Sequence, residues 1–188
     1  MSTTTTPTTL NDLSGTYAID PAHSRIGFVA RHAMITKVRG GFDAFEGKAV
    51  ADSADFADSA VELTIDVDSI DTRNEQRDGH LRSGDFLAIE EYPQITFVST
   101  AVRPSGPASF DLVGDLTIKG VTNSVTVPFE FEGGATDPFG NERVGFEGSV
   151  VINRQDYGVT WNAALETGGV LVSDKITLEF EISAIKAA

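Results

Sequence analysis

The sequence contains no cysteine among its 188 residues. This absence excludes disulfide bonds, a thiolate nucleophile and every zinc site that uses sulfur. Basic residues are also scarce, because 14 lysines and arginines stand against 28 aspartates and glutamates, for a formal net charge of -14. Without a lysine- or arginine-rich run, the chain should repel phosphate backbones and anionic lipid surfaces. We therefore expect no nucleic-acid partner.

Long apolar runs are missing as well, and none approaches the roughly 20 residues that a membrane-spanning helix needs. The first residues, MSTTTTPTTLNDLSG, have neither a basic start nor an apolar segment, and so do not resemble a secretory signal. We expect a cytoplasmic protein without stable membrane insertion. Residues 1–14 are mostly Thr, Ser, Asn and Pro, and we predict a disordered tail there. Residues 15–188 are predicted to form a single domain.

Alternation of apolar and polar residues is the dominant pattern of that domain. It is clearest at residues 61–67 and recurs at 110–118, 125–131, 144–152 and 176–182. A period of two is typical of strands with one covered face. Turn residues and short connections separate several of these strands, which favours an antiparallel meander.

One polar segment, TRNEQRDGHLRSGDF, interrupts the alternation. Thr72 followed by Glu75 is a possible capping box, and the segment predicts a short helix near residues 74–82. About eight strands with one apolar face each can close into a barrel, with the helix across one end. We therefore predict an all-β fold, an eight-stranded antiparallel barrel.

Alternation alone does not decide whether such a barrel is filled or hollow, because a packed interior produces the same pattern. Gly114 and Gly148 fall on the apolar face. We expect small residues at these positions to leave room inside the barrel.

Parity also indicates which polar residues share the apolar face, since side chains alternate across a strand. His32 has the parity of Ile26 and Phe28, whereas His23 does not. We therefore predict that His32 lies on the inner face and that His23 marks the start of the strand. A bulge would invert these positions, so each placement assumes a regular strand.

Five separated segments carry a family resemblance. They read YAIDPAHSRIGFVARH, GGFDAFEG, SIDTRNEQRDGHLRSGDFLAIEEYPQITFVST, GDLTIKGVTNSVTVPFEF and INRQDYGV. In order and spacing these segments resemble the YceI-like family, from Gly15 to the C-terminus. The resemblance implies a lipocalin-like barrel with an elongated apolar cavity for a long-chain amphiphile, typically a polyisoprenoid such as an isoprenyl diphosphate or a quinone. Many members of the family carry an export signal.

Together, parity and resemblance predict a non-enzymatic carrier, reservoir or sensor for an isoprenoid lipid, with no cofactor. We expect the lumen to be lined by Phe28, Ile65, Phe97, Leu112, Phe129, Phe146 and Phe180. The predicted residues at the head group or the mouth are His32, Arg154, Tyr157 and Trp161.

Each mouth residue also has a structural interpretation. Arg154, which is in line with an apolar row, could belong to a buried network, for instance with Asp156 or a carboxylate of another strand. His32 could likewise be held in such a network. Tyr157 and Trp161 could plug the end of the barrel instead of stacking on a ligand.

Two other function classes compete with the carrier. One is an enzyme that acts on a lipid-like substrate, with His32 and an acidic neighbour transferring a proton. The other is a packed barrel used for protein interaction, with a homodimer formed through an exposed strand edge as one form. A zinc site of three histidines is not expected, because no two histidines share one helical face. No G-x-S-x-G nucleophile motif is present.

Overall fold

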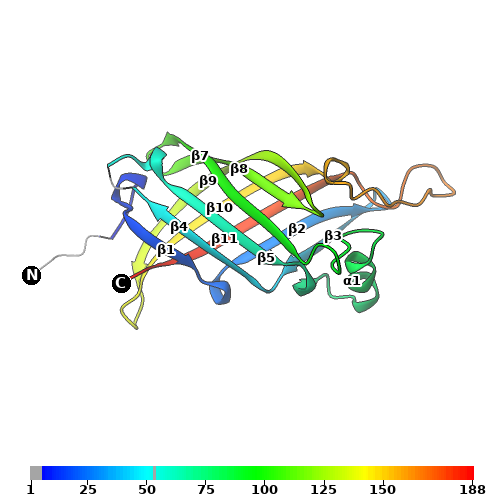
Figure 1. Cartoon of the computed structure of the whole chain (residues 1–188), viewed down its shortest axis with the longest axis horizontal. Coiled ribbons are helices and arrows are strands. Elements are labelled where there is room, and N and C mark those ends of the chain that lie inside the picture. Colours follow the sequence, from blue (N-terminus) through cyan, green and yellow to red (C-terminus); the bar gives the residue numbers. More distant parts are fainter. Residues whose placement is uncertain (1–5, 53) are drawn as a thin grey trace, which may run out of the picture.

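The computed structural model describes residues 6–52 and 54–188, and its main feature is a closed antiparallel barrel (Figure 1). Each barrel strand pairs with the next, and the first also pairs with the last, which closes the barrel. The eight-stranded antiparallel barrel predicted from alternation is confirmed. In spatial order its strands are β1 (Gly15–Ile19), β4 (Phe45–Ala51), β5 (Ala60–Asp66), β7 (Gln94–Gly106), β8 (Ser109–Ile118), β9 (Val121–Thr136), β10 (Glu142–Asn153) and β11 (Lys175–Lys186).

Three further strands extend the sheet past one end of the barrel. They are β2 (Arg25–His32), β3 (Thr36–Phe42) and the short β6 (Ile70–Asp71). One edge of β11 pairs with β1 near its C-terminal end and with β2 nearer its start, so β1 and β2 lie end to end along the same neighbour. A 3-10 turn at Pro21–His23 separates these two strands, and β3 and β6 are added beyond β2.

One α-helix is found in the described part of the chain, and this helix, α1 (Glu75–Arg82), confirms the short helix predicted near residues 74–82. Its N-cap is Asn74, whose side chain accepts from the N–H of Arg77, so the proposed capping box at Thr72 is wrong. Thr72 is instead buried, and its N–H and hydroxyl both donate to the carboxylate of Asp78. This contact ties α1 to the end of β6. No helix in residues 6–52 and 54–188 is long and apolar enough to cross a membrane.

The predicted disordered tail differs from the structure over its second half. A 3-10 turn at Leu10–Asp12 places Leu10 and Leu13 in the core, each only 2% exposed. The N–H of Leu10 donates to the carbonyl of Pro107, 2.9 Å away. Two leucines three residues apart are thus enough to fix this part of a polar segment. Residues 1–5 lie outside the described part of the chain.

Candidate functional site

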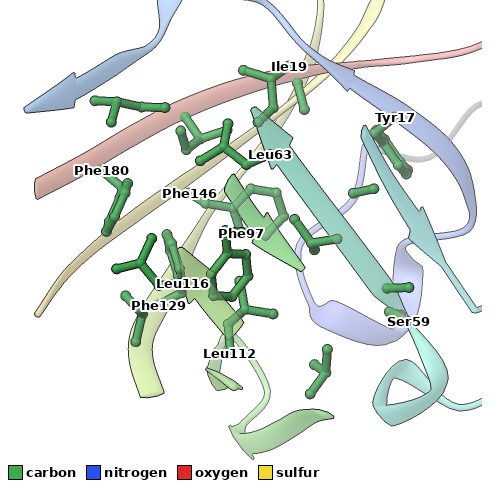
Figure 2. A pocket seen from close by; sticks show the side chains of 18 of the residues that line it. Tyr17, Ile19, Ser59, Leu63, Phe97, Leu112, Leu116, Phe129, Phe146 and Phe180 are labelled. Atoms are coloured by element: carbon green, nitrogen blue, oxygen red, sulfur yellow. The ribbon is translucent and has the colours of Figure 1, made fainter. Parts of the chain in front are cut away.

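An apolar cavity occupies the interior of the barrel (Figure 2). The space open to the centre of a water-sized sphere is about 170 Å³, more than ten times the roughly 10–15 Å³ that one water molecule needs. All eight barrel strands contribute to its wall, which is almost wholly apolar. Among the described residues that line it, none is charged, and Tyr17, Ser59 and Thr96 alone carry hydroxyl groups. Such a cavity suits a hydrocarbon chain.

The structure places six of the seven predicted lumen residues on the wall of this cavity. They are Ile65, Phe97, Leu112, Phe129, Phe146 and Phe180. Their contact with a ligand stays a prediction.

The seventh residue, Phe28, does not line the cavity and is a correction to the predicted set. Its ring packs on that of Phe42 with centroids 5.8 Å apart, and it covers Gly40, where a methyl group would collide with it. The start of β2 does reach the lumen, because Ile26, with the same parity, lines the cavity. Two residues farther on, the ring of Phe28 lies over Gly40 of the neighbouring strand β3 instead.

Gly114 and Gly148 also behave differently from the prediction. The space beside them is taken by aromatic rings, because a methyl group at Gly114 would collide with Phe97. One at Gly148 would come within 2.7 Å of Phe129 Cδ1. These glycines let the rings lie against the wall of the barrel, and the cavity is the space that remains between the rings.

Four neighbouring strands form an aromatic side of the lumen. Phe110 of β8 stacks on Phe129 of β9 with centroids 5.6 Å apart and planes inclined by 16°. Phe129 in turn contacts Phe180 of β11, and Phe110 contacts Phe146 of β10, both at 5.9 Å. Figure 2 shows Phe129, Phe146 and Phe180 among the side chains around the cavity. The four rings are thus linked by successive contacts along this side of the lumen.

Arg154 lies in a 3-10 turn, Arg154–Tyr157, directly after β10, and it does not line the cavity. It is 5% exposed, and its guanidinium donates to the carbonyls of Ser173 (2.9 Å), Val159 (2.7 Å) and Trp161 (2.9 Å). Burial lowers the pKa of Arg154, and the nearby carboxylate of Asp174 opposes that shift. The structural interpretation is therefore correct for Arg154, with Asp174 instead of Asp156 as the carboxylate.

His32 is exposed at the end of β2 and does not line the cavity, so its predicted position on the inner face at the mouth is wrong. It pairs with Thr36 of β3 and forms an isolated bridge with Val172. The pairing of β2 with β11 ends at Val29, so His32 lies beyond the part of β2 that belongs to this ladder. Within the described ranges, His32 forms no ion pair with a carboxylate.

Tyr157 and Trp161 close the α1 end of the barrel and are absent from the cavity wall. Tyr157 is 2% exposed, burial raises its pKa, and its hydroxyl has no hydrogen-bond partner among the described residues. The ring of Trp161 packs against His80 at 4.7 Å and Phe86 at 5.2 Å. Plugging the barrel end is therefore the role that the contacts of both side chains support.

His23 ends the 3-10 turn before β2, which confirms its predicted place at the start of the strand. Its Nδ1 lies 2.8 Å from Oδ2 of Asp20, which also accepts from Nη1 of Arg143 at 2.7 Å. The hydrogen bond from Arg143, and after it that from His23, lowers the pKa of Asp20 to about 2. Arg143 also donates to Asp137 at 2.8 Å, so this cluster joins the turn to the hairpin between β9 and β10.

Several lining residues from the first strands and turns of the chain are not among those predicted from the sequence. Leu13 and Phe56 lie in or beside 3-10 turns, where no period of two exists to indicate them. Leu63 has the parity of Ile65 and could have been added by the same argument. No three His, Cys, Asp or Glu side chains in the described residues are grouped so as to hold a metal ion.

Comparison with known proteins gives one family and a set of similar folds. The YceI-like domain family matches residues 17–184. A UPF0312 protein of Staphylococcus aureus strain MSSA476 is 43% identical over 169 residues, which cover 89% of this chain and 95% of that protein.

Solved structures have the same barrel. BcnA of Burkholderia cenocepacia is similar with a TM-score of 0.77 and 28% identity, over 88% of this chain and 98% of BcnA. A polyisoprenoid binding domain from Saccharophagus degradans is similar with a TM-score of 0.68, over 91% of this chain and 98% of that domain. Its 16% identity makes it evidence for the fold alone.

Proposed function

The chain belongs to the YceI-like domain family, and from this premise we propose that it binds one long-chain isoprenoid lipid in the lumen of its barrel. In this proposal the protein is a non-enzymatic carrier, reservoir or sensor. The observation that carries the proposal is the apolar cavity of about 170 Å³, whose wall contains no charged residue among those described. The choice of an isoprenoid as ligand class follows from the resemblance to the YceI-like family, whose model matches residues 17–184.

The energetics of burial favour a long chain over a short one. Each isoprene unit has five carbons, and its burial contributes up to about 4 kcal/mol at about 0.8 kcal/mol per carbon. Association costs on the order of 4 to 15 kcal/mol, so a few units offset it. Affinity can therefore come from the hydrocarbon tail alone.

The wall also restricts where a polar head group can lie. A diphosphate inside the cavity would be desolvated without a cationic partner, which is very unfavourable. Arg154 was predicted from the sequence to contact the head group, but its guanidinium already donates to backbone carbonyls. We therefore propose that the tail enters first and that a charged head group, where the ligand has one, stays in contact with water.

Native mass spectrometry of the protein purified from its own host tests the proposal. We expect a complex one lipid heavier than the chain, with an isoprenoid recovered by solvent extraction. The variant Ala49→Trp, in which a lining residue of β4 becomes large, should lose the lipid. Its matched control is Lys48→Trp, the exposed neighbour on the same strand, which should retain it. Lipid-free protein from the native host, or equal loading of both variants, would contradict the proposal.

A further inference from the structure

Two turns project together beyond the α1 end of the barrel, at the right of Figure 1. One is the turn at residues 33–35 between β2 and β3, and the other is the end of a hairpin at residues 165–171. The N–H of Ala33 donates to the carbonyl of Leu171 at 2.7 Å, which holds the two turns side by side. We call residues 33–35 and 165–171 the paired tip.

The paired tip exposes large apolar side chains to water. Met34 is 55% exposed, Ile35 78% and Val170 39%. Ala33 and Met34 have φ values of 51° and 63°, a left-handed conformation that is unfavourable for residues other than glycine. Grouped exposed apolar side chains are typical of an interaction surface.

Two basic side chains, those of Arg31 and Lys37, flank the apolar residues of the paired tip. Arg31 of β2 lies directly opposite Lys37 of β3, and like charges in this arrangement repel each other. Both are exposed, and neither forms an ion pair with a carboxylate of the described residues. Residues 25–42 hold four of the 14 basic residues of the chain and none of its 28 acidic ones. An anionic partner would relieve the repulsion between Arg31 and Lys37.

Only part of the net charge of -14 contributes to the electrostatic potential at the paired tip. Strand β9 alone has 16 residues, or roughly 50 Å at about 3.3 Å per residue, so the barrel is long. Charges are screened over about 8 Å at physiological ionic strength, and the carboxylates at the far end are several times farther away. Glu166 is the acidic residue within the tip, and nearby Asp174 faces Arg154 at 3.5 Å.

We propose that the paired tip docks the protein on the surface of an anionic lipid bilayer. Met34, Ile35 and Val170 enter the boundary between head groups and acyl chains, while Arg31 and Lys37 contact lipid phosphates. Basic residues around a small apolar tip are complementary to this layer, in which phosphates lie directly above hydrocarbon. The proposal goes beyond lipid binding in the lumen and does not depend on what the lumen contains.

Flotation of the full-length protein with vesicles tests the docking. We expect binding to vesicles of equal parts phosphatidylcholine and phosphatidylglycerol, weaker binding at high salt, and little binding to phosphatidylcholine alone. Arg31→Gln with Lys37→Gln should weaken binding about 25-fold, since each charge near an anionic surface contributes about fivefold. Met34→Asn with Ile35→Ser should weaken it about tenfold or more.

Matched controls separate docking from general stickiness and loss of charge. Phe139→Ser removes an 89%-exposed apolar side chain from the hairpin between β9 and β10, at the opposite end of the molecule. Lys48→Gln with Arg103→Gln removes two exposed cations elsewhere. Both should bind vesicles like the unchanged protein. Absence of vesicle binding, equal loss in the controls, or a dimer in solution that the tip substitutions dissociate would overturn the proposal.

Discussion

The middle of the barrel and its α1 end use the same kinds of side chain with opposite results. In the middle, Phe129, Phe146 and Phe180 surround open space whose wall has no charged residue among those described. At the α1 end, Tyr157 and Trp161 fill the available space, and the aromatic residues pack around backbone carbonyls that Arg154 satisfies. An inward-facing aromatic residue therefore lines a cavity only where its neighbours leave the centre of the barrel free.

Removal of Arg154 should disrupt the α1 end, and we expect a larger loss of stability than from an added methyl group at Gly114 in the lumen. Arg154→Met leaves the carbonyls of Ser173, Val159 and Trp161 without this donor. Each unsatisfied buried carbonyl costs about 1–3 kcal/mol, so the free energy of unfolding should fall by about 3 kcal/mol or more. Urea denaturation measures the loss.

Arg154→Lys is the matched control, because it keeps the charge but cannot reach all three carbonyls. We expect it to lose an intermediate amount of stability. A loss below about 1 kcal/mol for Arg154→Met would mean that water replaces the guanidinium and that the α1 end is not closed as described.

The sequence predicts the position of a side chain correctly where the residue lies inside a regular strand. Parity placed Ile65 and Phe146 correctly, because both lie within barrel strands that pair on both sides. It misplaced Arg154, which comes one residue after β10 ends, where a 3-10 turn abolishes the period of two. The polar character of the segment was likewise enough to predict α1, although the helix begins after Asn74 and not with a capping box at Thr72.

Other features depend on long-range pairing that a single sequence does not contain. Phe28 and His32 have inner-face parity, but the ring of Phe28 lies over Gly40 of β3, and His32 lies beyond the part of β2 that pairs with β11. The ring over Gly114 comes from Phe97 on the neighbouring strand β7. Leu10 and Leu13 are two apolar residues in a polar segment, too few to predict an ordered turn.

A second prediction concerns Phe97, which lines the lumen from β7. Gly114→Ala places a methyl group against the ring of Phe97 and the carbonyl of Val98, so the ring must move into the cavity. Overpacking of this kind costs about 1–3 kcal/mol. Urea denaturation should show the loss, and native mass spectrometry should show less bound lipid. Unchanged stability and loading would mean that Phe97 has a free alternative rotamer.

A glycine-to-alanine substitution in α1 should change the free energy of unfolding in the opposite direction, and by the smallest amount. Gly79 is exposed within the helix, and no atom lies within 4 Å of the position that a methyl group would take. Gly79→Ala should therefore raise the free energy of unfolding by about 0.5–1 kcal/mol, because alanine loses less backbone entropy in a helix. The shift of the urea midpoint measures it, and lipid loading should stay unchanged. Both variants, Gly79→Ala and Gly114→Ala, add one methyl group. If Gly79→Ala raises the free energy of unfolding and Gly114→Ala lowers it, the cost at Gly114 is due to the ring beside it. A destabilised Gly79→Ala would instead show that α1 packs against another part of the protein at this face.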